Sequence, residues 1–167
     1  MSYSPITVAE KFAELAQSEG KELTHMQLQK LTYIAHGYKL AISQGQPLIN
    51  DQVNAWKFGP VIPSLYHILK MWRGSPIPKN MLSMFSKHEP ISDADNDLIG
   101  AVYQAYGNMN GIELSELTHK NNTPWEQIWR NAGSNSSGAI IPDELIKKYY
   151  CGFLRCENTI KPMQNGA

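Results

Sequence analysis

The sequence predicts a mainly α-helical fold: a single compact domain of about six to seven helices with a small β-hairpin or short antiparallel strands. Three observations support this fold class. Residues that cap helix N-termini recur along the chain, glycine or proline punctuates the apolar segments between them, and strand-like alternation is confined to a short region. A chain of 167 residues suits one domain. We expect this domain to span residues 1–157 and a disordered tail to cover residues 158–167.

The first predicted helix lies close to the N-terminus. Thr7 and Glu10 have the spacing of a capping box, and Gly20 is a suitable C-terminal stop. We therefore expect a helix over about residues 8–19.

The second predicted helix is longer and is expected to be the centre of the core. Thr24 and Gln27 form another capping box, and the helix that they open should run to about residue 43. Apolar residues recur at helical spacing along one face of this segment: Leu28, Leu31, Ala35, Tyr38 and Ile42.

Extended structure is predicted in the middle of the chain. Residues 53–58 alternate in a way that favours a short hairpin or a single strand, and Gly59-Pro60 is interpreted as a turn. Pro63 opens a helix that should end near residue 73. Residues 75–78 can add a second strand at the edge of the first, because proline is tolerated at a sheet edge.

A connector with little pattern covers residues 79–91, and further helices follow it. Ser92 and Asp95 cap a helix over about residues 93–106, and a short helix is predicted over residues 111–117. The acidic residues at the start of the first of these helices are explained by the helix dipole.

The C-terminal part predicts two more helices on either side of a loop. Thr123-Pro124-Trp125-Glu126 combines an N-cap, proline at the first helical position and an acidic third residue, so a helix of one or two turns should follow. Residues 133–138 are rich in Gly and Ser and should form a mobile loop. Pro142 opens a last helix that should run to about residue 157.

The charge composition argues against nucleic acid as a partner. Fifteen basic residues balance fifteen acidic ones, and the densest basic stretch is only Lys147-Lys148. No apolar run is long enough to cross a bilayer, and the N-terminus lacks the features of a signal peptide. Cys151 and Cys156 are interpreted as reduced thiols. These features predict a cytoplasmic protein without a membrane partner.

No catalytic, cofactor-binding or metal-binding residue is predicted. The five histidines lack ligand spacing, no nucleophile elbow is present, and the Gly/Ser stretch lacks the lysine of a phosphate-binding loop. His119 is interpreted as a structural residue whose ring bonds backbone carbonyls, with a role in partner binding as the alternative. The sequence therefore predicts neither an enzyme nor a small-molecule substrate. An enzyme whose active site has no recognisable motif is the remaining alternative.

Aromatic residues next to arginine are the best candidates for binding a protein partner. Tryptophan and arginine are the side chains that most often dominate the binding energy of protein interfaces. The candidates are Trp72, Arg73, Trp129 and Arg130, together with His119.

Three sequence segments together resemble the Panacea domain, a small, mostly helical domain of bacteria and phages that serves as the antitoxin in many toxin–antitoxin pairs. The first segment covers residues 28–37, the second residues 55–61, and the third residues 114–119 with Pro124-Trp125. The residues that carry the resemblance are Leu28, Gln29, Lys30, Leu31, Tyr33, Gly37, Ala55, Trp56, Gly59, Pro60, Val61, Tyr66, Leu114, Thr118, His119, Pro124 and Trp125.

Most of these motif residues are expected to be structural. Gly59 permits a tight backbone turn, and Pro60 fixes φ at the entry to the next helix. Trp56 is interpreted as a large apolar plug that fastens the turn to the long helix, with a cost of roughly 3–5 kcal/mol on truncation. Gly37 is expected either to let another group approach closely or to leave the helix face flat. Lys57-Phe58 departs from the family pattern.

The resemblance implies that the protein neutralises a toxin encoded by the adjacent gene, by direct binding and without a cofactor. Delivery of the toxin to a protease is the second mechanism that the resemblance implies. A phage or mobile-element protein that acts on a host protein is the alternative function. The gene neighbourhood distinguishes the two functions: a small toxic neighbour favours the antitoxin, and an isolated gene in a phage region favours the alternative.

Overall fold

The computed structural model describes residues 1–132 and 138–154, and within them it confirms the mainly helical fold class. The described residues form eight α-helices, one short 3-10 helix and two small antiparallel sheets. The extra helix relative to the prediction, α4, has only five residues and lies in the segment expected to be an irregular connector. The helices are α1 Pro5–Ser18, α2 His25–Ile42, α3 Pro63–Leu69, α4 Lys79–Ser83, α5 Asp93–Tyr106, α6 Gly111–His119, α7 Pro124–Ala132 and α8 Asp143–Cys151.

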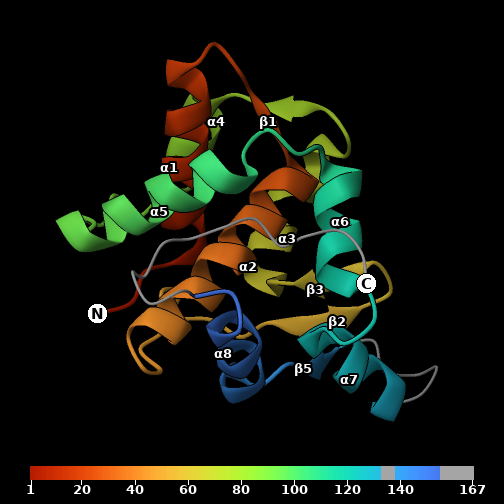
Figure 1. Ribbon diagram of the computed structural model, residues 1–167. Helices are drawn as coiled ribbons and strands as arrows, with labels where there is room; N and C mark the ends of the chain where they lie inside the picture. The colour runs from red at the N-terminus through yellow and green to blue at the C-terminus, as the bar shows by residue number, and fades with distance from the viewer. Residues whose placement is uncertain (133–137, 155–167) are drawn as a thin grey trace.

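The long helix α2 runs through the centre of the molecule, and α1, α5, α6 and α8 pack around it (Figure 1). The capping box of Thr24 and Gln27 is present at its start. Leu28, Leu31, Ala35 and Tyr38 of the expected stripe are buried, and so is every other residue from 28 to 38, which the one-sided stripe did not predict. Ile42, at the end of the expected stripe, is 40% exposed. The polar side chains of α2 therefore need partners inside the protein.

The predicted hairpin is present, but its turn lies elsewhere than expected. Strand β2, Asn54–Trp56, pairs antiparallel with β3, Gly59–Val61, so the turn is Lys57-Phe58 and not Gly59-Pro60. Pro60 is accommodated because β3 is an edge strand of the sheet. The third strand, β5 (Ala139–Ile140), pairs with the other side of β2 and was not predicted.

The extended segment around Pro76 pairs with a different strand from the one expected. Strand β4, Pro76–Ile77, pairs with β1, Leu23–Thr24, in a separate two-stranded sheet. Leu23 and Ile77 lie opposite each other and are both buried. Burial of this pair fixes the start of α2 next to the segment that follows the 3-10 helix Lys70–Trp72.

Several helix ends differ from the prediction for local reasons. Helix α1 begins at Pro5 and not at residue 8, because proline occupies its first turn and the Thr7 hydroxyl donates to Glu89 instead of capping the helix. Helices α6 and α7 each run to nine residues, longer than expected. Helix α8 ends at Cys151, where Gly152 follows, well before residue 157.

Two expectations fall on parts of the chain that the structure does not describe. The predicted loop lies almost wholly within residues 133–137, and the predicted tail lies within residues 155–167. Both expectations, with the domain boundary at residue 157, stay predictions.

Buried polar side chains join the helices at two points. His36 is fully buried: its Nδ1 accepts the backbone N–H of Leu48 at 3.3 Å, and its Nε2 donates to Asp143 at the start of α8 at 3.0 Å. Asp95, predicted to take part in the cap of α5 and to favour its dipole, is buried and accepts hydrogen bonds from Lys39 and Tyr3. Burial alone would raise the pKa of the Asp95 carboxyl, but these hydrogen bonds hold it below its usual value.

Candidate functional site

The β2–β3 hairpin is fastened to the central helix by a buried lysine. Lys30 is 2% exposed, and its Nζ donates to the carbonyl oxygen of Pro60 at 2.8 Å and to that of Phe58 at 3.4 Å. An ammonium group inside a protein needs such acceptors, because burial without them is costly. These two hydrogen bonds explain why Lys30 belongs to the sequence motif: its ammonium group binds carbonyls on both sides of the hairpin turn.

A neighbouring amide fixes the chain at the end of the hairpin. The Gln29 side chain donates to the Ile62 carbonyl at 3.1 Å and accepts the Ile62 N–H at 3.0 Å. The amide therefore makes two hydrogen bonds with a single backbone unit and copies the pairing of a β-strand. The entry to α3 is held at a fixed distance from α2 as a result.

Helices α6 and α7 hold the hairpin from the other side. Ser115 donates to the Phe58 carbonyl at 2.9 Å, and the indole N–H of Trp125 donates to the Trp56 carbonyl at 2.6 Å. The ring of Trp125 packs edge-on against His119, with 5.4 Å between centroids. The three motif segments, far apart in sequence, thus converge on one hairpin.

His119 makes the contact that its structural interpretation predicts. Its Nδ1 lies within hydrogen-bond distance of the carbonyl of Ser115, one turn earlier in α6. The His119 Cβ also lies 3.4 Å from the position that a Cβ on Gly59 would occupy. Gly59 has φ of +116°, and such a Cβ would stand 3.0 Å from Lys30 Nζ. Glycine is needed here by both the backbone conformation and the crowded surroundings.

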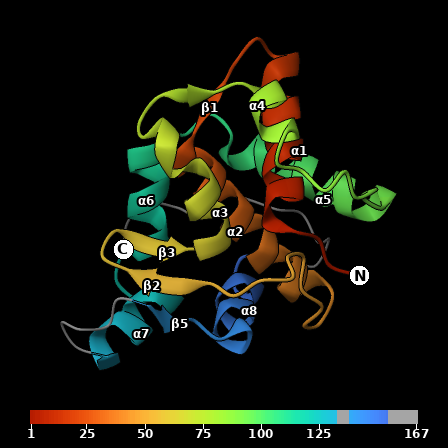
Figure 2. The same ribbon diagram turned by 180° about the vertical axis from the view of Figure 1, so that it is seen from behind.

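An open groove of about 320 Å³ lies beside the hairpin, between the start of α2 and α3. Figure 2 shows α3 and β3 side by side in front of α2. The apolar part of the groove is formed by Met26, Trp56, Phe58, Val61 and Tyr66. Its polar part consists of His25, Gln29, Lys30, Lys57 and Arg73.

The charges around the groove are all basic. Lys57 and Arg73 are exposed, and no aspartate or glutamate is among the residues that line the groove. Burial lowers the pKa of Lys30 to about 7. Burial is the main cause that lowers the pKa of His25 to about 4, and the positive charge of Lys30 is the second cause. This groove is a local basic surface on a chain whose formal net charge is zero.

Trp56 does not plug the core in the way that the sequence suggests. It is only partly buried, and its ring packs against Tyr66 of α3 with 4.7 Å between centroids, on the wall of the groove. The buried tryptophan is Trp125, which is 7% exposed. The outward position of Trp56 follows from the place of the hairpin turn, and the cost of its truncation should lie below that of a core tryptophan.

The predicted partner-binding residues lie in two places. Arg73 lines the groove, and Trp72, just before it, packs edge-on against Phe85. Trp129 stacks on Trp125 in α7, and the exposed Arg130 forms an ion pair with Glu126. Arg73 is thus the one of these four residues that shares the groove with Trp56 and Tyr66 among the described residues.

Phe58 is the main residue that the sequence prediction missed. Its side chain is 63% exposed at the hairpin turn, and Lys57 Nζ lies 5.4 Å from the centroid of its ring. A signal was present: a two-residue turn between short strands places an aromatic side chain in solvent. Interpretation of Gly59-Pro60 as the turn hid that signal.

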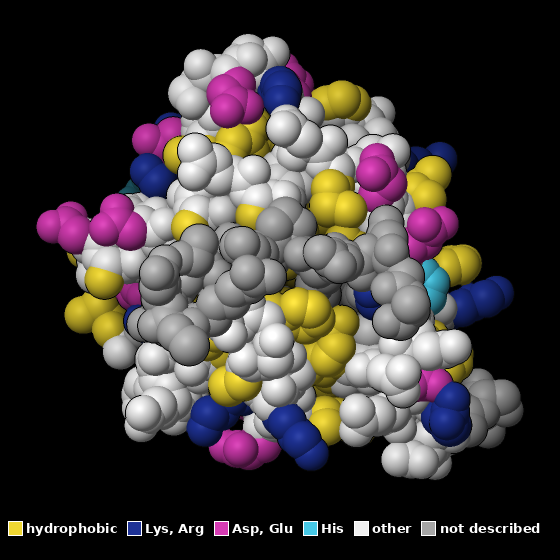
Figure 3. All heavy atoms as spheres, viewed as in Figure 1, with side chains coloured by type: hydrophobic (Ala, Val, Ile, Leu, Met, Phe, Trp, Pro, Cys, Tyr) yellow, Lys and Arg dark blue, Asp and Glu magenta, His cyan; other side chains and the backbone are white. Residues whose placement is uncertain are grey.

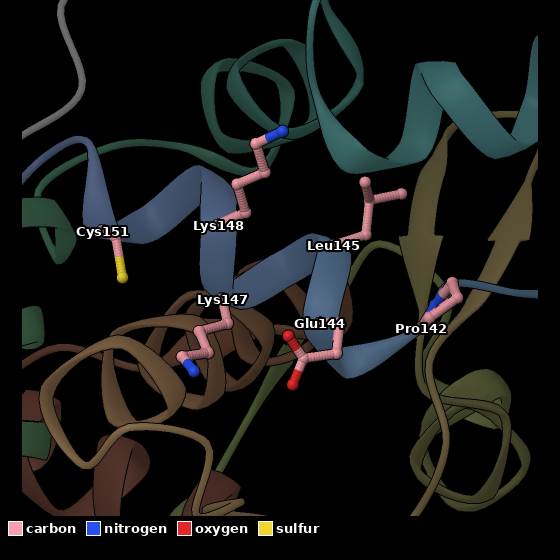
Figure 4. A pocket seen from close by; sticks show the side chains of 6 residues that line it. All are labelled: Pro142, Glu144, Leu145, Lys147, Lys148 and Cys151. Carbon is pink, nitrogen blue, oxygen red and sulfur yellow. The ribbon is translucent and has the colours of Figure 1, made fainter.

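Two other hollows that described residues line have different sets of side chains. One, of about 570 Å³, lies along α8, where Lys148 and Leu145 point to one side of the helix and Glu144, Lys147 and Cys151 point to the other (Figure 4). On the face seen in Figure 3, acidic and basic side chains are interspersed around the rim. In the described part of the chain, no three His, Cys, Asp or Glu side chains are grouped as metal ligands, and no helix has the length and hydropathy to cross a membrane.

Comparison with known proteins identifies the family to which this chain belongs. Residues 28–126, more than half of the chain, match the family described as antitoxin SocA-like, Panacea domain. The chain belongs to this family. It is also 34% identical over 133 residues to antitoxin SocA of Caulobacter vibrioides (strain NA1000 / CB15N), over 75% of this chain and 70% of that protein. No solved structure matches the chain. The resemblance inferred from the sequence motifs is therefore confirmed.

The Panacea match coincides with the elements that build the hairpin and its groove. It runs from α2, through β2, β3 and α3, to the first turn of α7. Lys30, Gln29, Ser115 and Trp125, which hold the hairpin, all lie inside it, whereas α1 and α8 lie outside. The shared part of the fold is thus the support for this surface.

The two basic groups with lowered pKa values should make folding stability depend on pH. Between pH 4 and 6.5 the unfolded His25 binds a proton that the folded His25 does not, and between pH 7 and 10.5 the same holds for Lys30. The free energy of unfolding should therefore rise with pH over both windows, by at most about 1.4 kcal/mol per unit for each group.

Urea unfolding between pH 4 and 9.5 measures this slope. The His25→Gln variant should flatten the acid window and Lys30→Met the alkaline window. A wild-type slope that persists in both variants would show that other groups cause it.

Proposed function

We propose that this protein is an antitoxin that neutralises a cognate toxin by direct binding, with the β2–β3 hairpin and its groove as the contact surface. The relationship to antitoxin SocA supports an antitoxin role. The observation that carries direct binding is the convergence of the three motif segments on one hairpin whose turn exposes Lys57 and Phe58. A rigid support under an exposed aromatic side chain is typical of a protein interface.

The proposal requires no chemical step by this protein. The polar groups at the hairpin are occupied by backbone hydrogen bonds: Lys30 and Ser115 both bind the Phe58 carbonyl, and Gln29 binds Ile62. Their role is to hold the surface, and binding energy should come from the aromatic and basic side chains beside it. The partner is a toxin protein, which we expect the adjacent gene to encode.

Co-expression with the adjacent gene tests the function. We expect the neighbouring product alone to stop growth, and this protein to restore growth and to co-purify with the product at a fixed ratio. The toxin level measured by immunoblot separates two mechanisms: it stays constant if binding alone blocks the toxin, and it falls if a protease removes the toxin. A neighbour that is harmless and does not co-purify would contradict the proposal.

A further inference from the structure

We propose that the groove beside the β2–β3 hairpin binds a segment of the toxin in which a bulky apolar side chain stands next to a carboxylate. This inference rests on the proposed antitoxin function and specifies the chemistry of the partner. Three observations carry it: the size and apolar wall of the groove, the sign of the charges around it, and the rigidity of its supporting turn.

The groove has room for one large side chain and offers it an apolar wall. Its volume of about 320 Å³ lies at the lower end of the range, roughly 300–1,000 Å³, of cavities that hold small ligands. The rings of Trp56 and Tyr66 meet at 67° with 4.7 Å between centroids, and Phe58 adds a ring that is 63% exposed. Such a wall favours an aromatic or large aliphatic side chain of the partner, which would remove these rings from water.

The charges select a carboxylate next to that side chain. Lys57 and Arg73 are both exposed at the groove, the buried Lys30 lies beneath it, and none of the lining residues is acidic. Acidic and basic residues are equal in number over the whole chain, so this grouping is a local feature. A guanidinium group beside an apolar pocket can bind a carboxylate with two hydrogen bonds, and the match of opposite charges also speeds the encounter.

The turn that carries Phe58 is fixed before the partner binds. The Phe58 carbonyl accepts hydrogen bonds from Lys30 on α2 and from Ser115 on α6, and the Trp56 carbonyl accepts one from Trp125 on α7. A surface held by three helices loses little conformational entropy on binding. The backbone that carries Phe58 is therefore held in place, and the partner has to order only the side chain.

The experiment compares groove variants with matched variants elsewhere. The probe is the product of the adjacent gene, purified from its complex with the wild-type chain, and the dissociation constant is measured by surface plasmon resonance. Phe58→Ala and Trp56→Ala test the apolar wall, and Met84→Ala is their control because Met84 is 74% exposed at the end of α4. Arg73→Glu and Lys57→Glu test the charges, and Lys87→Glu, on the connector between α4 and α5, is their control.

We expect each groove variant to raise the dissociation constant at least about tenfold and each control to change it less than about twofold. The effect of the two charge reversals should shrink at high salt, because the rim charges are exposed to solvent. Thermal melting of every variant checks that the fold is retained, and the exposed positions of Phe58, Lys57 and Arg73 make this the expected result.

The outcomes distinguish this inference from the function on which it rests. If the wild-type chain rescues growth while the groove variants bind as tightly as wild type, the antitoxin function stands and the groove is not the contact surface. If only the apolar variants weaken binding, the carboxylate is excluded as part of the partner segment. If Phe58→Ala instead dissociates a dimer of this chain in gel filtration and leaves toxin binding intact, the occupant is a second copy and the inference is wrong.

Discussion

The Gly37→Ala variant should lose about 1–3 kcal/mol of stability, although alanine is the better helix former. Gly37 lies in the middle of α2, where the exchange alone would favour the helix by about 1 kcal/mol. A Cβ at this position would stand less than 3.0 Å from three ring carbons of Tyr150 on α8. The Tyr150 ring is fully buried and packs against Tyr38 with 4.9 Å between centroids, so it has no free space to move into.

A double-mutant cycle assigns this cost to the contact between α2 and α8. In the Tyr150→Ala background the obstruction is gone, and Gly37→Ala should then be neutral or slightly stabilising. Urea unfolding of the four proteins gives the coupling energy. Equal costs of Gly37→Ala in both backgrounds would show that the ring of Tyr150 is not what excludes the side chain.

Gly37 also shows how far the sequence could predict the packing. A glycine inside a well-capped helix indicates either that some group approaches closely or that the helix face is flat, and in the structure the first of these holds. The sequence could not name the group, because Tyr150 lies 113 positions further along the chain, beyond the residues that match the family. Capping residues act over three or four neighbours and are readable from sequence, whereas a contact between distant helices depends on the whole fold.

The hairpin illustrates the same limit at the candidate site. Alternation in residues 53–58 predicted extended structure, and the family motifs brought Lys30, Trp56 and Trp125 together as residues of one group. Which tryptophan is buried could not be read from them, since it depends on a turn displaced by two residues. The partner of β4 was also beyond reach: burial of Leu23 against Ile77 decides that pairing, and apolar residues on other short strands would have been equally acceptable.

Lys30 shows why a motif residue can mislead at the level of sequence. A lysine in a helix is usually exposed, and its place among apolar neighbours gives no hint of what it binds. In the structure it donates to the carbonyls of Phe58 and Pro60, on the two sides of the turn. The motif therefore specifies the residues that support the hairpin.

Trp125→Ala should be the variant that most strongly couples loss of stability to loss of toxin binding. Truncation of a buried tryptophan costs about 3–5 kcal/mol. Trp125 is 7% exposed, packs against His119 and Trp129, and donates its indole N–H to the Trp56 carbonyl at 2.6 Å. Its loss removes the contact of α7 with the hairpin, so β2 and the Lys57-Phe58 turn should loosen as well.

The Trp125→Phe variant separates the two contributions of this side chain. Phenylalanine keeps an aromatic ring in the core but leaves the Trp56 carbonyl without its donor, which should cost about 1–3 kcal/mol. Hydrogen exchange of the β2 and β3 amides should accelerate in both variants, and growth rescue by co-expression should weaken in the order wild type, Trp125→Phe, Trp125→Ala. Measured at a temperature where all three are folded, full rescue by Trp125→Ala would show that the toxin does not depend on an ordered hairpin. Hydrogen exchange of the hairpin amides reports how firmly the helices hold the hairpin, and growth rescue reports whether the hairpin surface binds the toxin. Agreement between the two measurements would show that neutralisation depends on the hairpin geometry that Lys30, Ser115 and Trp125 maintain.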